Sequence, residues 1–219
     1  MPDLAERFFD ALQQTRVVAI ARTRQADGLI EAFGALCDGG VVLVEVTLTI
    51  PGALGVIREA STRFGSAVQV GCGTVLDARS AEDAIEAGAS FVVSPSFHED
   101  VVATCAARGV VAVPGCLTPT EVATAMRAGS QVIKLFPGRV ATPDYLRDLL
   151  GPLPGARFLP TGNVDLDTAP RYIESGAVAV GVGKALLDPV AIGEGSYATI
   201  TAAARSFREA VDAVGRSSR

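Results

Sequence analysis

The feature that most constrains the fold is a repeated alternation of short apolar runs with longer segments of helical periodicity. Each of the eight runs is rich in apolar and β-branched residues and is typical of a strand buried on both faces. The runs cover residues 17–22, 41–47, 68–71, 91–94, 110–113, 131–136, 157–161 and 178–182. The helical segments cover 26–38, 52–64, 78–87, 99–108, 119–128, 142–150, 165–175 and 196–214. This alternation predicts parallel strands joined by crossover helices.

The borders of the expected helices carry residues that start and stop helices. Thr118 and Thr142 each precede a proline, and each places a capping hydroxyl just before a residue suited to the first helical position. Glycine follows many of the segments, where the chain often turns into the left-handed conformation. These glycines are Gly39, Gly88, Gly109, Gly129 and Gly176. The local signals therefore agree with the alternation.

Eight consecutive strand–helix units without a linker predict one domain over residues 1–219. Because eight parallel strands close into a barrel, we predict an α/β fold of the single-domain (β/α)8 TIM barrel class. A helical segment at 3–15 predicts an extra N-terminal helix before the first strand. The alternative, an open doubly wound sheet, normally carries G-x-G-x-x-G after its first strand, and this chain has Arg22-Thr23-Arg24 there.

Composition argues against several classes of function. A net charge of −5 without a basic run disfavours nucleic acid as a partner. A single His and the lack of a C-x-x-C pair disfavour a metal centre, so we expect no metal and reduced, buried thiols. The thiols belong to Cys37, Cys72, Cys105 and Cys116. An acidic N-terminus and apolar runs too short for a bilayer predict a soluble, cytoplasmic protein that does not engage a membrane.

Two charged residues interrupt strands that should be apolar. In the sixth run, alternation places Lys134 on the same face as Phe136, and in the second run it places Glu45 on the same face as Thr47. Lysine and glutamate are almost never fully buried unless they are paired. One interpretation is a structural ion pair, although burying two charges usually adds little net stability.

The other interpretation is catalytic. Apolar walls disfavour the charged form of an amine and free its lone pair, so Lys134 can add to a ketone and form an iminium. The iminium accepts electrons from a neighbouring bond, and a carboxylate such as Glu45 can move the protons that this step requires. We therefore predict Lys134 and Glu45 as a catalytic pair at the C-terminal ends of the strands, where barrels place their active sites.

Loops after the last two strands predict a phosphate site. Such loops commonly bind phosphate through backbone N–H groups, whereas tight turns without a ligand are the alternative reading. The candidate residues are Thr161, Gly162 and Asn163 after the seventh strand, and Gly181, Gly183 and Lys184 at the eighth. Lys184 also has a bland interpretation, as a solvated residue in the first turn of the next helix.

Other strand ends complete the predicted pocket. Thr74 follows a glycine-rich strand end and brings a hydroxyl to the rim, and Arg22 ends the first strand within reach of an anion. Pro95 forms a rigid turn that shapes the pocket. His98 begins a helix, where a solvent-facing or capping role is expected.

Taken together, these residues resemble the 2-keto-3-deoxy-6-phosphogluconate / 4-hydroxy-2-oxoglutarate aldolase family. The resemblance covers nearly the whole chain, with the motifs in the order and spacing of the family. The motifs are Val44-Glu45-Val46-Thr47, Gly71-Cys72-Gly73-Thr74-Val75, Val93-Ser94-Pro95, Val113-Pro114-Gly115, Ile133-Lys134-Leu135-Phe136-Pro137 and Leu159-Pro160-Thr161-Gly162.

The resemblance implies a role for each matching residue. Lys134 would form the Schiff base, Glu45 would be the general acid/base, and Thr74 would bind the pyruvyl carboxylate. Phe136 would pack beside the lysine, and Thr161, Gly162 and the 181–183 loop would hold the phosphate. It also implies a homotrimer, no metal and no dissociable cofactor.

The chain departs from the family pattern at three places. Thr49 stands where many members carry an Arg, and Arg22 matches an Arg that other members carry at the end of strand one. Asn163 replaces the second Gly of a T-G-G motif, and Lys184 replaces a small Ser. The exact substrate of the phosphate site stays open at this point.

We predict a class I aldolase, a carbon–carbon lyase, that reversibly cleaves 2-keto-3-deoxy-6-phosphogluconate to pyruvate and glyceraldehyde 3-phosphate. Its partners would be a small 2-keto acid and a phosphorylated aldehyde. The galactonate epimer and 4-hydroxy-2-oxoglutarate are alternative substrates. A non-catalytic phosphosugar-binding barrel would not need Lys134 and Glu45, and a metal-dependent aldolase or isomerase would need clustered carboxylates or histidines at the strand ends.

Overall fold

The structure is a computed structural model that describes residues 3–216. Within that range ten helices and nine strands alternate along the chain. The elements are α1 (Leu4–Thr15), β1 (Val17–Ala21), α2 (Leu29–Asp38), β2 (Leu43–Thr47), α3 (Ala53–Phe64), β3 (Gln69–Gly73), α4 (Ala78–Glu86), β4 (Phe91–Val93), α5 (Glu99–Ala107), β5 (Val111–Val113), β6 (Gly115–Cys116), α6 (Pro119–Arg127), β7 (Ile133–Leu135), α7 (Pro143–Leu150), β8 (Phe158–Pro160), α8 (Thr168–Glu174), β9 (Val180–Val182), α9 (Pro189–Gly193) and α10 (Tyr197–Arg216).

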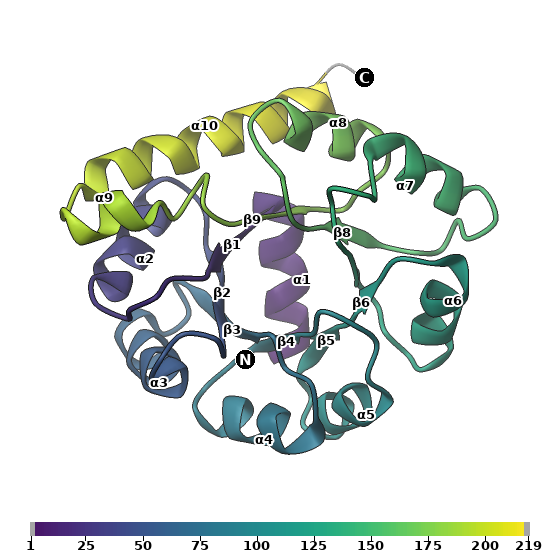
Figure 1. The fold of residues 1–219 in the computed structure, drawn as a ribbon, viewed down its shortest axis with the longest axis horizontal. Helices are drawn as coiled ribbons and strands as arrows, with labels where there is room; N and C mark the ends of the chain where they lie inside the picture. Colours follow the sequence, from purple (N-terminus) through teal and green to yellow (C-terminus); the bar gives the residue numbers. More distant parts are fainter. Residues whose placement is uncertain (1–2, 217–219) are drawn as a thin grey trace.

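All the strand pairs are parallel, and the strands curl around a common axis with helices outside them (Figure 1). One sheet has six strands in the order β5-β4-β3-β2-β1-β9, and the other has three in the order β6-β7-β8. A bridge between Thr161 and Gly181 links the end of β8 to β9. The architecture is an α/β fold like that of a TIM barrel, with the C-terminal ends of all strands at one end of the molecule.

Each predicted run contains a strand, but the elements differ from the prediction in two places. The fifth run ends at Pro114, which has no N–H to donate, and the chain resumes as the separate strand β6 that pairs with β7. The short helix α9 was not predicted; it begins after Asp188, whose side chain accepts a hydrogen bond from Val190 N. The predicted caps at Thr118 and Thr142 are confirmed, and Thr118 forms a capping box with Glu121.

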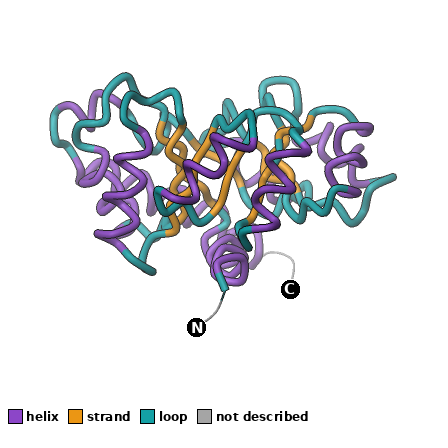
Figure 2. Tube along the Cα trace, turned by 90° about the horizontal axis from the view of Figure 1, so that it is seen from below, coloured by secondary structure: helices purple, strands orange, loops and turns teal. Residues whose placement is uncertain are grey.

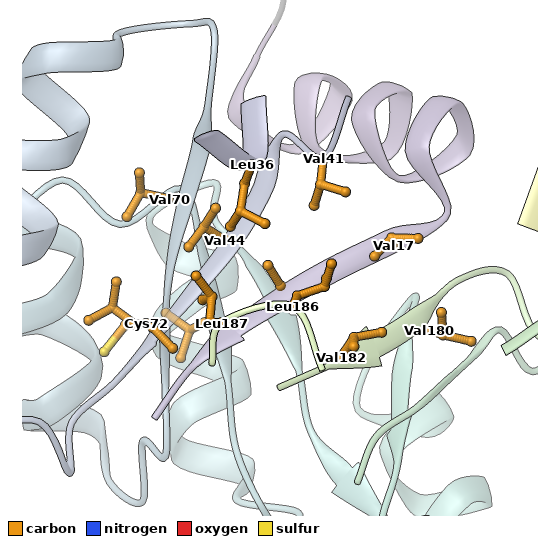
Figure 3. Close-up of a cluster of buried hydrophobic side chains, with 14 of the residues drawn as sticks. Val17, Leu36, Val41, Val44, Val70, Cys72, Val180, Val182, Leu186 and Leu187 are labelled. Carbon is orange, nitrogen blue, oxygen red and sulfur yellow. The ribbon is translucent and has the colours of Figure 1, made fainter. Parts of the chain in front are cut away.

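The core has two layers on opposite faces of the strands. The outer layer lies between the strands and the surrounding helices, and part of it is drawn in Figure 3. The inner layer lies inside the curl and includes Leu43, Val113, Val132 and Leu159. These two sets come from alternate positions of the strands, as the period of two requires.

Helix α1 closes one end of the curled strands. Figure 2 shows it below the strands, and Figure 1 shows it across the middle of the ring. Its buried face carries Phe8, Ala11 and Leu12, which belong to the inner layer, and the Phe8 ring lies 5.0 Å from that of Phe91. The N-terminal ends of the strands are therefore covered by an apolar helix face, and the chemistry is left to the C-terminal ends.

The four thiols are free, and three of them are buried as predicted. Burial raises the pKa of Cys72 to about 12, so its thiol stays protonated at neutral pH and acts as an apolar side chain. Cys37 differs from the prediction, because it is only half-buried. Among the described residues, no helix is both long and apolar enough to cross a membrane.

Candidate active site

Lys134 and Glu45 come from different sheets and meet inside the curl. Lys134 is the middle residue of β7 and is 3% exposed, and Glu45 is the middle residue of β2 and is 1% exposed. The lysine Nζ lies 4.0 Å from Glu45 Oε1. The inward alternation expected for both strands therefore brings an amine and a carboxylate together in a space that is otherwise apolar.

The surroundings of the lysine are lean in polar groups. Phe136 follows β7, and its ring centroid lies 5.2 Å from Lys134 Nζ, so the ring face shields the amine from water. In the strand register Lys134 lies between Gly115 of β6 and Leu159 of β8. Gly115 packs directly against the backbone of Pro95, since a Cβ there would overlap the Pro95 carbonyl. This close approach sets the position of the Pro95 turn.

The carboxylate of Glu45 has room because its neighbour on β3 has no side chain. A Cβ on Gly73 would overlap Glu45 Oε1 and would lie 2.5 Å from Cδ. Sequence reasoning read this glycine only as bare backbone for an anion. Glu45 Oε1 is buried and has no hydrogen-bond partner among the described residues, so it is a free acceptor facing the lysine.

The rim beside Glu45 carries the predicted carboxylate-binding residues. Arg22 is exposed just after β1, and its Nη2 donates to Thr74 Oγ1 at 3.3 Å. Thr74 has φ of 65°, which is rare for a β-branched residue and costs of order 1–3 kcal/mol. Thr47 Oγ1 is already tied to Ala21 O at 3.0 Å, so its hydroxyl joins two strand ends.

The loops after β8 and β9 lie side by side. Thr161 is buried and bridges Gly181, where a Cβ would overlap the threonine hydroxyl. Gly162 and Asn163 follow with φ of 93° and 57°, so both are left-handed. Gly183 and the exposed Lys184 follow β9.

A glycine that sequence reasoning missed supports the loop after β8. Gly138 N donates to Thr161 O at 2.8 Å, and a Cβ on Gly138 would overlap the carbonyl of Gly162. The signal in the sequence was Pro137-Gly138 directly after the lysine strand. His98 occupies the N-cap position of α5 but does not cap it; its Nε2 lies 2.9 Å from Ser96 Oγ, so the capping interpretation was wrong.

A TIM-barrel-like α/β fold with a buried amine and carboxylate at the C-terminal ends of its strands is the frame of an aldolase, a carbon–carbon lyase. The family model "KDPG and KHG aldolase" matches residues 9–203, and the chain belongs to this family.

Two curated relatives and one solved structure illustrate the similarity. The 2-dehydro-3-deoxy-phosphogluconate aldolase of Treponema pallidum is 32% identical over 198 residues, which cover 89% of this chain and 92% of the relative. The 2-dehydro-3-deoxy-6-phosphogalactonate aldolase of Escherichia coli is 29% identical over 196 residues, 89% and 96% of the two chains. The crystal structure of a 4-hydroxy-2-oxoglutarate / 2-dehydro-3-deoxyphosphogluconate aldolase from TTHB1 superposes with a TM-score of 0.82 at 33% identity, covering 96% and 99% of the two chains.

We expect Gly73→Ala to displace the Glu45 carboxylate and to lower kcat/KM for aldol cleavage by about 10²-fold or more, because proton transfer by a positioned group is worth roughly 10²–10⁴. Overpacking should also lower the free energy of unfolding by about 1–3 kcal/mol. Steady-state kinetics and denaturant unfolding measure the two effects.

Gly55→Ala is the matched control, because Gly55 lies within α3 and a Cβ there meets nothing within 4 Å. This change should leave kcat/KM unaltered and should raise the free energy of unfolding by about 0.5–1 kcal/mol. Wild-type kinetics in Gly73→Ala would contradict the assignment of Gly73 as the residue that makes room for Glu45.

Proposed function

We propose that this chain is a class I aldolase that reversibly cleaves 2-keto-3-deoxy-6-phosphogluconate to pyruvate and glyceraldehyde 3-phosphate. The observation that carries the proposal is the buried Lys134 amine 4.0 Å from the carboxylate of Glu45. Curated relatives from Treponema pallidum and Pseudomonas aeruginosa, at 32% and 31% identity, are phosphogluconate aldolases by name and support this substrate.

The reaction follows from the chemistry of the pair. Neutral Lys134 Nζ attacks C2 of the keto acid, and the carbinolamine loses water to give an iminium. Glu45, directly or through a water, takes the proton of the C4 hydroxyl, and the electrons of the C3–C4 bond move into the iminium as the aldehyde leaves. The resulting enamine is protonated at C3, and water releases pyruvate and the free amine.

The burial of the pair suits both halves of this sequence. A lysine shielded by Phe136 is less stabilised as an ammonium than one in water, so the nucleophilic form is more accessible. Glu45 Oε1 has no hydrogen-bond partner among residues 3–216 and is free to accept the substrate proton. The same dry interior protects the iminium and the enamine from premature hydrolysis.

The substrate would lie along the C-terminal rim with its two anionic ends apart. Arg22 and Thr74, already joined by a hydrogen bond, would bind the pyruvyl carboxylate. The walls of the pocket would be Thr47, Pro95 and Phe136. The phosphate would be held by Thr161, Gly162, Asn163, Gly181, Gly183 and Lys184 at the two adjacent loops.

Several finer features belong to the same proposal. We infer one domain over residues 1–219, a closed (β/α)8 TIM barrel with α1 as the extra N-terminal helix; the fifth strand would be the β5–β6 pair around Pro114. The protein would be a cytoplasmic homotrimer without a metal or cofactor, consistent with the free thiols among the described residues. The galactonate epimer is the second candidate substrate, because the relative from Escherichia coli is a phosphogalactonate aldolase by name.

Trapping of the Schiff base tests the function directly. The chain has only two lysines, Lys134 and Lys184, so borohydride reduction in the presence of pyruvate should add one pyruvyl adduct, on the peptide bearing Lys134. Lys134→Ala should abolish both the adduct and cleavage, because no other buried amine is present among the described residues, and Lys184→Ala should retain the adduct. An adduct on Lys184, or turnover without any adduct, would exclude the mechanism; intact-mass and peptide-mass spectrometry read the result.

Replacement of Glu45 separates proton transfer from amine capture. Glu45→Gln keeps the shape of the side chain and removes the proton acceptor, so cleavage and exchange of the pyruvate methyl protons should fall by about 10²–10⁴. The pyruvyl adduct should still form. The exchange rate is measured by proton NMR in D₂O, and an unchanged rate in the variant would assign the proton to another group.

The two predicted anion sites differ in which substrates they affect. A charge-assisted hydrogen bond is worth about 1.5–3 kcal/mol, so Lys184→Ala should raise KM for phosphorylated substrate about tenfold or more. The same variant should cleave unphosphorylated 4-hydroxy-2-oxoglutarate at nearly the normal rate, whereas Arg22→Ala should impair both substrates because both carry the pyruvyl carboxylate. An unaltered KM in Lys184→Ala would mean that Lys184 is solvated and binds no phosphate.

A further inference from the structure

A cavity of about 380 Å³ lies at the opposite end of the strands from Lys134, between α1 and the starts of β7, β8 and β9. Phe9 and Leu12 of α1 form one wall, and Val132 and Val178 form the other. The volume lies within the range of pockets that hold small organic ligands. None of the residues assigned to the aldolase reaction lines this cavity.

Two arginines and no acidic residue line the cavity. Arg16 immediately precedes β1, and Arg157 immediately precedes β8. The lead-in to β9 runs between them, because Val180 N donates to Arg16 O and Val178 N donates to Phe158 O, each at 3.0 Å. With neighbouring strands about 4.8 Å apart, the two arginine Cα atoms are about 10 Å apart, and both side chains can reach one anion.

Arg16 is held in a conformation that a residue with a Cβ rarely adopts. Its φ is 55°, in the left-handed region where glycine or asparagine normally ends a helix. The backbone N–H donates to Leu12 O at 2.9 Å, and the guanidinium Nη1 donates to Val211 O at 3.1 Å. The remaining guanidinium nitrogens have no described partner and lie at the cavity wall. An arginine at a position that favours glycine points to a use for its charge.

The positive charge at the cavity is incompletely compensated. Burial lowers the pKa of Arg16, and this effect exceeds the opposing attraction of Asp212, which is itself paired with Arg208 at 3.0 Å. Arg157 forms no ion pair with any residue whose side chain the structure describes; its guanidinium carbon lies 5.8 Å from the centroid of the Phe9 ring. That ring holds the Arg157 head group over the cavity without neutralising it.

We propose that this cavity is a second binding site, for a small organic anion with a phosphate or carboxylate group and a short apolar body. The guanidinium groups of Arg16 and Arg157 bind the anionic group from two sides, and the walls formed by Phe9, Leu12, Val132 and Val178 receive the apolar part. Arginine suits this task because its planar fork binds both oxygens of a phosphate or carboxylate. The site is independent of the aldolase reaction, which lies at the other end of the strands.

Phenyl phosphate is a suitable probe, since it combines a phosphate with an apolar body. Isothermal titration at low ionic strength should show binding to the wild-type protein and at least tenfold weaker binding to Arg157→Ala. Arg157→Lys, which keeps the charge and loses the fork, should fall between the two. Any binding at the Lys134 end contributes equally to these proteins, so their difference reports the cavity alone.

Two further variants control for charge and for shape. Arg127→Ala removes an exposed arginine on α6 that does not line the cavity, so it should bind like the wild type. Gln13→Trp leaves both arginines in place and fills the cavity from the exposed side of α1, so it should abolish binding. Phenyl phosphate should also raise the Tm of the wild type and of Arg127→Ala but not of Gln13→Trp. Equal isotherms for the wild type and Arg157→Ala, or no binding to either, would overturn the proposal.

Discussion

The rest of the structure depends on the burial of an amine and a carboxylate 4.0 Å apart in the interior of the curled sheet. Removing two such charges from water costs several kcal/mol for each, and their mutual attraction rarely repays more than that cost. The pair is therefore not there to stabilise the fold. The stability comes from the two apolar layers, one outside the strands and one inside them, and the inner layer is completed by the apolar face of α1. Because α1 closes the N-terminal end, the polar pair can face only the C-terminal opening.

Space for this pair is made by residues without side chains on the neighbouring strands. Gly73 leaves room for the Glu45 carboxylate, Gly115 permits contact with Pro95, and Gly181 permits contact with Thr161. Each of these glycines points into the curl, where a Cβ would overlap a specific atom. A strand interior normally disfavours glycine, so the sheet gives up some of its own stability to shape the pocket. Thr74 shows the same trade in another form, as a β-branched residue held at positive φ beside Arg22.

Much of this arrangement is predictable from the sequence, because a period of two decides which strand residues face inward. That rule placed Lys134, Glu45 and Phe136 on the inner face, and the threonine–proline pairs and glycines marked the helix ends. The features that were missed depend on contacts between distant segments. The break at Pro114 separates β5 from β6 through pairing with β7, and the roles of Gly73 and Gly138 follow from atoms on other strands. The side-chain partner of His98 is equally a matter of tertiary geometry, and the residue type alone favoured a cap.

The choice between the two basic residues follows the same chemistry throughout the chain. Only two of its 19 Lys and Arg residues are lysines, and both lie at the C-terminal end of the strands. Arginine stays charged in essentially any protein environment and cannot act as a nucleophile, so a lysine is required where a free amine must attack a ketone. Where a cation must only bind an anion, arginine is the better residue because its fork fixes the geometry. The lysine inside the curl and the arginines around the covered end are therefore separate solutions, the first to covalent chemistry and the second to recognition of charge.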